Sequence, residues 1–195
     1  FQSVLPLATT SANAPVAPTE GLLTTTHPTI SVYNDTQLSE LIASNGWSGN
    51  GTEGNPYIIE DLDIDAHGAT NASLIGSTAQ HLVIRGCYLH NTSVGFGGFP
   101  YNGNCGATIY NASNVTLEQN VCTGHGRGLA LYQSTGVTVR NNTCYGNVHG
   151  IGLYYSNGNF VVGNNCTSDG TDGIHFEVSS TNVIEANLCT MNGRY

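Results

Sequence analysis

Short runs of alternating apolar and polar residues follow one another along most of this chain. Leu129-Ala-Leu131 and Val137-Thr-Val139 are two such runs, and clusters of Gly, Asn and Ser separate them. Alternation with a period of two predicts β-strands, and none of these runs has the spacing of an amphipathic helix. Residues 114–195 are therefore predicted to be short strands joined by bends.

The pattern of residue types in this region returns every 22 or 23 positions. A fixed period of this length indicates a solenoid, whose units bury their apolar faces against one another. Each unit contains V-x-V, then N-x-C, then G-I-x-L, which favours three strands per coil over a leucine-rich repeat. Stacked coils lie about 4.8 Å apart, so equal positions form ladders. The predicted columns are an apolar one (Leu117, Val139, Val162 and Ile184), an internal asparagine ladder (Asn120, Asn142, Asn165 and Asn187) and a glycine column (Gly128, Gly150 and Gly173).

These repeats resemble those of NosD-like right-handed parallel β-helix proteins, in which I-x-x-N-x-I is followed by G-I-x-L. The segment GWSGNGTEGNPYIIE at 46–60 resembles the start of such helices in archaeal cell-surface proteins. The resemblance covers residues 29–195 and implies an all-β fold, a right-handed parallel β-helix solenoid of about six coils. It implies no single function, because the superfamily includes surface proteins, carbohydrate enzymes and copper-site accessory proteins.

The chain divides into three parts on its sequence pattern. Residues 1–28 are rich in Thr, Ala, Ser and Pro and are predicted to be an N-terminal arm or linker. Residues 29–55 hold a strand at 29–33 and a capping helix, which begins after the capping box Asn34-Asp-Thr-Gln37 and ends before Gly46. We expect this helix to cover the first coil of the β-helix at 56–195. An irregular excursion at 94–104 is expected to project from the wall as a contact surface.

Composition narrows the classes of partner. The net charge is -9, charged residues make up 9% of the chain, and its four basic residues are all arginine. Such a surface does not attract nucleic acid or anionic lipid, and no run of about 20 apolar residues predicts a membrane span. Because the chain begins at Phe1, we expect removal of a signal peptide and an extracellular, cell-surface location.

Eight Asn-x-Ser/Thr sequons support the same location, although an Asn- and Thr-rich β-helix also produces them by chance. Asn165 is expected to be inaccessible in the ladder. The glycosylation candidates are Asn34, Asn50, Asn71, Asn91, Asn111, Asn114 and Asn141.

The six cysteines are disulfide candidates. Cys122, Cys144 and Cys189 share one inward column, and Cys166 is predicted to lie one place before it. Cys122 and Cys144 are close enough for a disulfide between coils, or they serve as small core residues. Cys87 and Cys105 lie off the column, and Cys105 is expected to be exposed. Intermolecular bonds are expected through Cys105 or Cys166.

Two outward rows are candidate binding surfaces. Tyr110, Tyr132 and Tyr154 form a predicted aromatic ladder, which suits sugar rings, a neighbouring subunit or simple stacking within the wall. Asp61, Asp63 and Asp65 alternate along the first coil and share one face. This acidic row is either a calcium site or a solvated surface.

Catalysis is not expected. Gly124-His125-Gly126 resembles one motif of polygalacturonases, but the other acidic and basic segments of that family are absent. The four arginines do not cluster with a carboxylate set of the kind that a lyase of this fold requires. The seven histidines do not recur in register, so the copper site that the NosD resemblance implies is not expected, and no cofactor is predicted apart from the calcium candidate.

The last predicted coil has no cap, which indicates either a fragment of a longer protein or subunits that pair with one another. We therefore expect a non-enzymatic extracellular structural protein that self-assembles into a layer, sheath or filament. The alternative is a secreted carbohydrate-binding or polysaccharide-cleaving β-helix.

Overall fold

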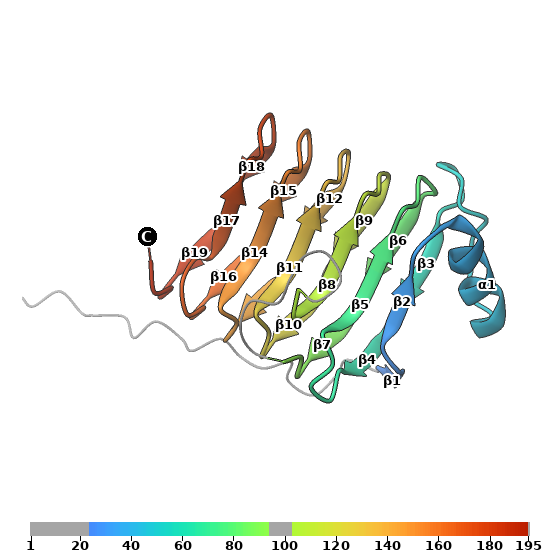
Figure 1. The fold of residues 1–195 in the computed structure, drawn as a ribbon, viewed down its shortest axis with the longest axis horizontal. Helices are drawn as coiled ribbons and strands as arrows, with labels where there is room; N and C mark the ends of the chain where they lie inside the picture. Colours follow the sequence, from blue (N-terminus) through green and yellow to red (C-terminus); the bar gives the residue numbers. More distant parts are fainter. Residues whose placement is uncertain (1–23, 94–102, 195) are drawn as a thin grey trace, which may run out of the picture.

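The computed structural model describes residues 24–93 and 103–194, which form a right-handed parallel β-helix closed at one end by a helix (Figure 1). Three parallel sheets make its walls, and each coil contributes one strand to each sheet. The first sheet contains β1 (Thr25–Thr26), β4 (Leu62–Asp65), β7 (Tyr88–His90), β10 (Val121–Thr123), β13 (Thr143–Tyr145), β16 (Asn165–Thr167) and β19 (Leu188–Thr190). The second contains β2 (Ile30–Val32), β5 (Asn71–Gly76), β8 (Cys105–Tyr110), β11 (Arg127–Tyr132), β14 (His149–Tyr154) and β17 (Ile174–Glu177). The third contains β3 (Tyr57–Glu60), β6 (Leu82–Arg85), β9 (Val115–Glu118), β12 (Thr138–Arg140), β15 (Phe160–Val162) and β18 (Val183–Glu185).

The core lies inside the coils, as the alternating pattern requires. In β9, Val115 and Leu117 are buried while Thr116 and Glu118 are partly exposed. The predicted apolar column is confirmed except at one position. Val139 pairs with Val161, which is fully buried, so Val161 rather than Val162 belongs to the core.

The asparagine ladder exists, but its third member is Asn164. Asn120 donates from its backbone N and its Nδ2 to Asn142 Oδ1, both at 3.0 Å. Asn142 donates in the same way to Asn164, and Asn164 donates to Asn187. Each Nδ2 also bonds the carbonyl of the preceding coil, so these buried amides are satisfied. The prediction for Asn165 was wrong, since this residue begins β16 and is only half-buried.

The error at Asn165 comes from the position at which the repeat lengthens. Cys144 pairs with Cys166, 22 residues later, whereas Ile151 pairs with Ile174, 23 residues later. The additional residue therefore lies after β16, in the turn that leads to β17. If the additional residue is assigned before β16 rather than after it, the predicted ladder position moves from Asn164 to Asn165.

Helix α1 (Asp35–Asn45) covers the first coil, as predicted (Figure 1). Asn34 Oδ1 accepts from the Gln37 backbone N at 2.9 Å, and Gly46 ends the helix with a positive φ of 67°. Leu38 and Ile42 enter the apolar core, so the helix covers what would otherwise be an open cross-section.

Two sequence predictions are affected by the range that the structure describes. Most of the predicted arm and most of the excursion at 94–104 lie outside the described residues. Within the predicted arm, Thr25–Thr26 form β1 and pair with β4, so the sheets begin earlier than expected.

Candidate metal site

Polar side chains occupy the beginning of the second-sheet strands. Cys105 pairs with Arg127, and Arg127 pairs with His149, so these residues form one column across β8, β11 and β14. All three are buried. A cationic side chain and an imidazole in a buried column need polar partners, and these come from the next coil and from the end of β14.

His149, Asp172 and His175 form a compact cluster, called here the metal-site cluster. One oxygen of Asp172, Oδ2, lies 3.1 Å from His149 Nδ1 and 3.1 Å from His175 Nδ1. The two imidazole rings are 4.8 Å apart between centroids. One ligand atom from each residue falls within 4.8 Å of the others. Two imidazoles and a carboxylate at these separations can share one transition-metal ion.

The cluster exists because of the irregular turn after β16. Thr171 donates from its backbone N to Val148 O at 2.8 Å, and Gly150 N donates to Asp172 O at 3.0 Å. The extra residue of the 23-residue repeat thus places Asp172 beside His149 of the preceding coil. Thr171 Oγ1 lies 2.7 Å from His149 Nδ1, the same nitrogen that Asp172 Oδ2 contacts, and helps to orient the ring.

Burial favours the neutral form of His149. Desolvation, followed by the nearby His175, lowers the pKa of His149 to about 4. Its side chain is 9% exposed, whereas those of Asp172 and His175 are 23% and 32% exposed. At neutral pH a neutral imidazole is therefore available as a ligand in a pocket that solvent still reaches.

Arg127 and Tyr154 form one wall beside the cluster. Arg127 Nε donates to Tyr154 Oη at 2.8 Å, and its guanidinium carbon lies 5.0 Å from the centre of the Tyr154 ring. Burial raises the pKa of Tyr154. The ring lies across Gly152, where a Cβ would be 2.5 Å from Tyr154 Cε2. Glycine at this position therefore leaves the space that Tyr154 occupies next to His175.

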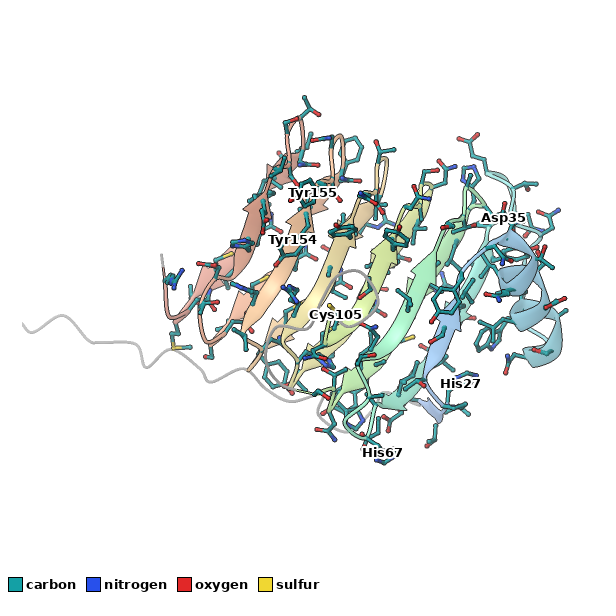
Figure 2. All side chains as sticks on the ribbon, in the orientation of Figure 1. His27, Asp35, His67, Cys105, Tyr154 and Tyr155 are labelled. Carbon is teal, nitrogen blue, oxygen red and sulfur yellow. The ribbon has the colours of Figure 1, made fainter. Side chains whose placement is uncertain are left out.

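This arrangement corrects the predicted aromatic ladder. Tyr110, Tyr132 and Tyr154 are in register, but the Tyr154 side chain is buried and directed to Arg127. Tyr155 takes its place, with its ring 5.7 Å from that of Tyr132 and 46% of the residue exposed (Figure 2). The outward aromatic row consists of Tyr110 and Tyr132, which are half-buried, and of Tyr155, which is exposed.

The cysteine column is longer than predicted. Cys144 pairs with Cys122 on one side and Cys166 on the other, and Cys166 pairs with Cys189. Cys166 therefore lies in the column, contrary to the prediction. Cys105 is fully buried rather than exposed, and Cys166 is also fully buried, which removes both expected routes to intermolecular bonds. All six cysteines, Cys87 included, are present as thiols, and disulfides within the column stay a prediction.

Most sequon asparagines are exposed, with Asn91, Asn111, Asn114 and Asn141 at turn positions of positive φ. Asn34 and Asn50 are also exposed. Asn71 is not suited to carry a glycan, because it is buried and its Oδ1 accepts from Thr108 Oγ1 at 3.1 Å.

The acidic row does not form a shared ion site. Asp63 Oδ1 lies 2.8 Å from His90 Nε2, and Asp65 accepts from the His67 backbone N at 2.8 Å. That backbone bond is the main reason that the pKa of Asp65 is lowered. Within 24–93 and 103–194, the metal-site cluster is the group of three whose ligand atoms meet, and Asp61, Asp63 and Asp65 do not.

His125, from the Gly-His-Gly motif, has a structural position. Its two ring nitrogens lie 2.9 Å from Thr92 Oγ1 and 2.9 Å from Leu89 O, and burial lowers its pKa to about 4.

The metal-site cluster was not predicted from the sequence, because the prediction considered only histidines that recur in one column. His149 and Asp172 each precede a column glycine, and His175 lies two residues after Gly173, so a search across neighbouring columns could have found them.

The fold and the cluster define a parallel β-helix protein with a two-histidine, one-carboxylate group on its wall. A family model described as periplasmic copper-binding protein (NosD) matches residues 26–195. The chain belongs to the NosD family. No curated protein and no solved structure gave a significant match. Among the described residues, no helix has the length and apolar character needed to cross a membrane.

The donor set of the cluster fits the copper named in the family description. Imidazole suits copper, and Cu(II) binds nitrogen and oxygen ligands more strongly than the other divalent first-row metals do. His149 and His175 would each give one nitrogen and Asp172 one oxygen. The histidines do not recur in one column, as the sequence indicated, yet two of them meet across columns on one carboxylate.

Proposed function

We propose that this chain is a non-catalytic β-helix protein of the periplasm or cell exterior that binds copper in the metal-site cluster. The observation that carries the proposal is the position of Asp172 Oδ2, 3.1 Å from one nitrogen of each histidine. The description of the family as periplasmic and copper-binding supports it. Both ring nitrogens of His125, the histidine of the Gly-His-Gly motif, contact groups inside the protein, which supports a non-catalytic role for the chain.

Titration of the purified chain with Cu(II) tests this function. We expect one tightly bound ion whose electron paramagnetic resonance spectrum shows coupling to two imidazole nitrogens. His175→Ala removes a ligand and should weaken binding by at least about 100-fold, since even residues that only orient ligands commonly cost 10–100-fold. Asp172→Asn should also weaken binding, because a neutral amide replaces the anionic oxygen.

His67→Ala is the matched control, because this histidine side chain is 83% exposed and lies outside the cluster. It should bind Cu(II) as the wild type does. Equal affinity of the wild type and His175→Ala, or equal loss in His67→Ala, would contradict the proposal.

Self-assembly is a second candidate function, and the apolar residues exposed on β17, β18 and β19 favour it. Strands β18 and β19 are exposed at every residue, and Ile184, whose partner Val161 is fully buried, is 43% exposed. Large apolar residues also exposed on this coil are Phe176, Val178, Val183, Leu188 and Met191. We propose that a second copy of the chain covers this edge in an extracellular layer or filament.

Analytical ultracentrifugation of the wild type and Leu188→Lys tests this assembly. The wild type should form concentration-dependent oligomers, and a lysine on the exposed edge should return it to monomers. Monomeric wild type at high concentration would contradict the proposal. The carbohydrate alternative has less support, because Tyr154 is buried against Arg127 and, of the row formed by Tyr110, Tyr132 and Tyr155, only Tyr155 is exposed.

A further inference from the structure

A second internal ladder lies at the bend between the first and second sheets. In three successive coils a backbone N donates to the side-chain Oδ1 of the next coil. His125 N donates to Asn147 Oδ1 at 3.1 Å, Asn147 N donates to Asp169 Oδ1 at 3.0 Å, and Asp169 N donates to Asn192 Oδ1 at 2.9 Å. Asp169 therefore occupies a position that the coils on both sides fill with asparagine.

The Nδ2 atoms of the two ladder asparagines show that this position requires a hydrogen-bond donor. Asn147 Nδ2 donates to Cys122 O at 3.1 Å, and Asn192 Nδ2 donates to Cys166 O at 3.0 Å. Cys144 lies between these cysteines in the same column. From this register Asp169 Oδ2 is expected to face Cys144 O, at the position where the neighbouring coils have the Nδ2 donor of an asparagine.

An ionised carboxylate cannot make this bond, because both of its oxygens only accept. Asp169 is 2% exposed, and among the described residues its Oδ2 is buried without a hydrogen-bond partner. Two acceptors facing each other away from water are unfavourable, whereas a protonated carboxyl group supplies the missing donor.

We propose that Asp169 is a proton-binding site of the folded protein: below neutral pH it carries a proton on Oδ2 and donates it to Cys144 O. Loss of this proton at higher pH leaves a buried charge in the ladder and weakens the turn at 169–172. That turn is held to the preceding coil by Gly170 N, which donates to Asn147 O at 2.7 Å, and by Thr171 N.

The surroundings of the carboxyl group favour the protonated form. Its titratable neighbours are the thiols of Cys144, Cys166 and Cys189, on β13, β16 and β19. Gly150 of β14 faces it without a side chain, and a Cβ there would be 2.6 Å from Asp169 Oδ2. Burial raises the pKa of Asp169 to about 7, against the opposing effect of the hydrogen bonds from Asn147.

The pH dependence of stability follows from the two protonation states. In the unfolded chain Asp169 ionises near its ordinary pKa of 3.8, whereas in the folded protein it keeps the proton up to about 7. As pH rises between these values the unfolded state releases the proton first, so the folding equilibrium constant falls, by up to about 1,000-fold in total. Above this window the loss is constant.

Denaturant unfolding of the metal-free protein between pH 4 and pH 8, with a chelator present, tests the proposal. In Asp169→Asn the amide supplies the donor at every pH. The folding constant of this variant relative to the wild type should therefore rise by up to about 1,000-fold from pH 4 to pH 8. A ratio that stays the same across this range would overturn the proposal.

Asn147→Asp is the matched variant, because it places the same group one coil earlier. It should acquire a further loss of stability over the same pH range. In the wild type at pH 6, infrared spectroscopy should show a protonated carboxyl stretching band that Asp169→Asn lacks, and absence of this band would also overturn the proposal. None of these measurements depends on metal binding, so their failure is distinct from failure of the copper proposal.

Discussion

The asparagine ladder and the turn at 169–172 are both parts of the same repeat, yet they behave differently. In the ladder, Asn120, Asn142 and Asn164 each donate in the same way to the asparagine of the next coil, and Asn187 accepts the last of these bonds. In the turn, an inserted residue breaks the period and brings Asp172 to His149. Regular positions thus hold the coils together, and the departure from regularity assembles the chemically competent residues.

Substitutions at Asn164 and Asn165 test the role of the asparagine ladder, and the first of them has the largest expected effect on stability. Asn164→Ala removes the acceptor for two donors of Asn142 and the donor to Val139 O. We expect a loss of about 2–4 kcal/mol in the free energy of unfolding, because buried polar groups lose their partners. Asn165→Ala should cost less than about 1 kcal/mol, since its side chain is only half-buried. Urea unfolding measures both.

The order of these two effects is the informative result. If Asn165→Ala were the more damaging variant, the ladder would run through Asn165, and the repeat would lengthen before β16 rather than after it.

Gly152→Ala tests the wall beside the irregular turn, with a smaller expected effect. Its Cβ would meet the Tyr154 ring at 2.5 Å, so the ring must move away from Arg127. We expect a loss of about 1–3 kcal/mol on overpacking. The control is Gly54→Ala, which places a Cβ in open space and should change stability by less than about 0.5 kcal/mol. A near-UV circular dichroism change confined to Gly152→Ala would show the displaced tyrosine.

Much of the fold could be predicted from the sequence, because it depends on short-period patterns. Alternation of apolar residues gave the strands, and the capping box at Asn34 gave α1. The error at Asn165 has a simple origin. Two adjacent asparagines fit the same column, and the period alone does not say where a repeat of 23 residues gains its additional residue.

The candidate site could not be predicted by a search for histidines within one column. His149 and His175 occupy different columns, and the turn that carries Asp172 has a conformation set by backbone hydrogen bonds to the preceding coil. The position of Tyr154 was missed for a similar reason, since the space for its ring comes from Gly152 on the same strand and its partner, Arg127, comes from another coil.

Because α1 closes one end of the β-helix, the coils have a preferred order of folding that begins at that end. Each strand inside a sheet pairs with strands of the preceding and following coils, so a coil added next to a completed one finds its template already formed. A chain that folds as it is synthesised or exported would close the α1 end first. His149 and Asp172 belong to coils that meet only when β17 pairs with β14, so the proposed ion site would form late, after the wall up to that point is complete.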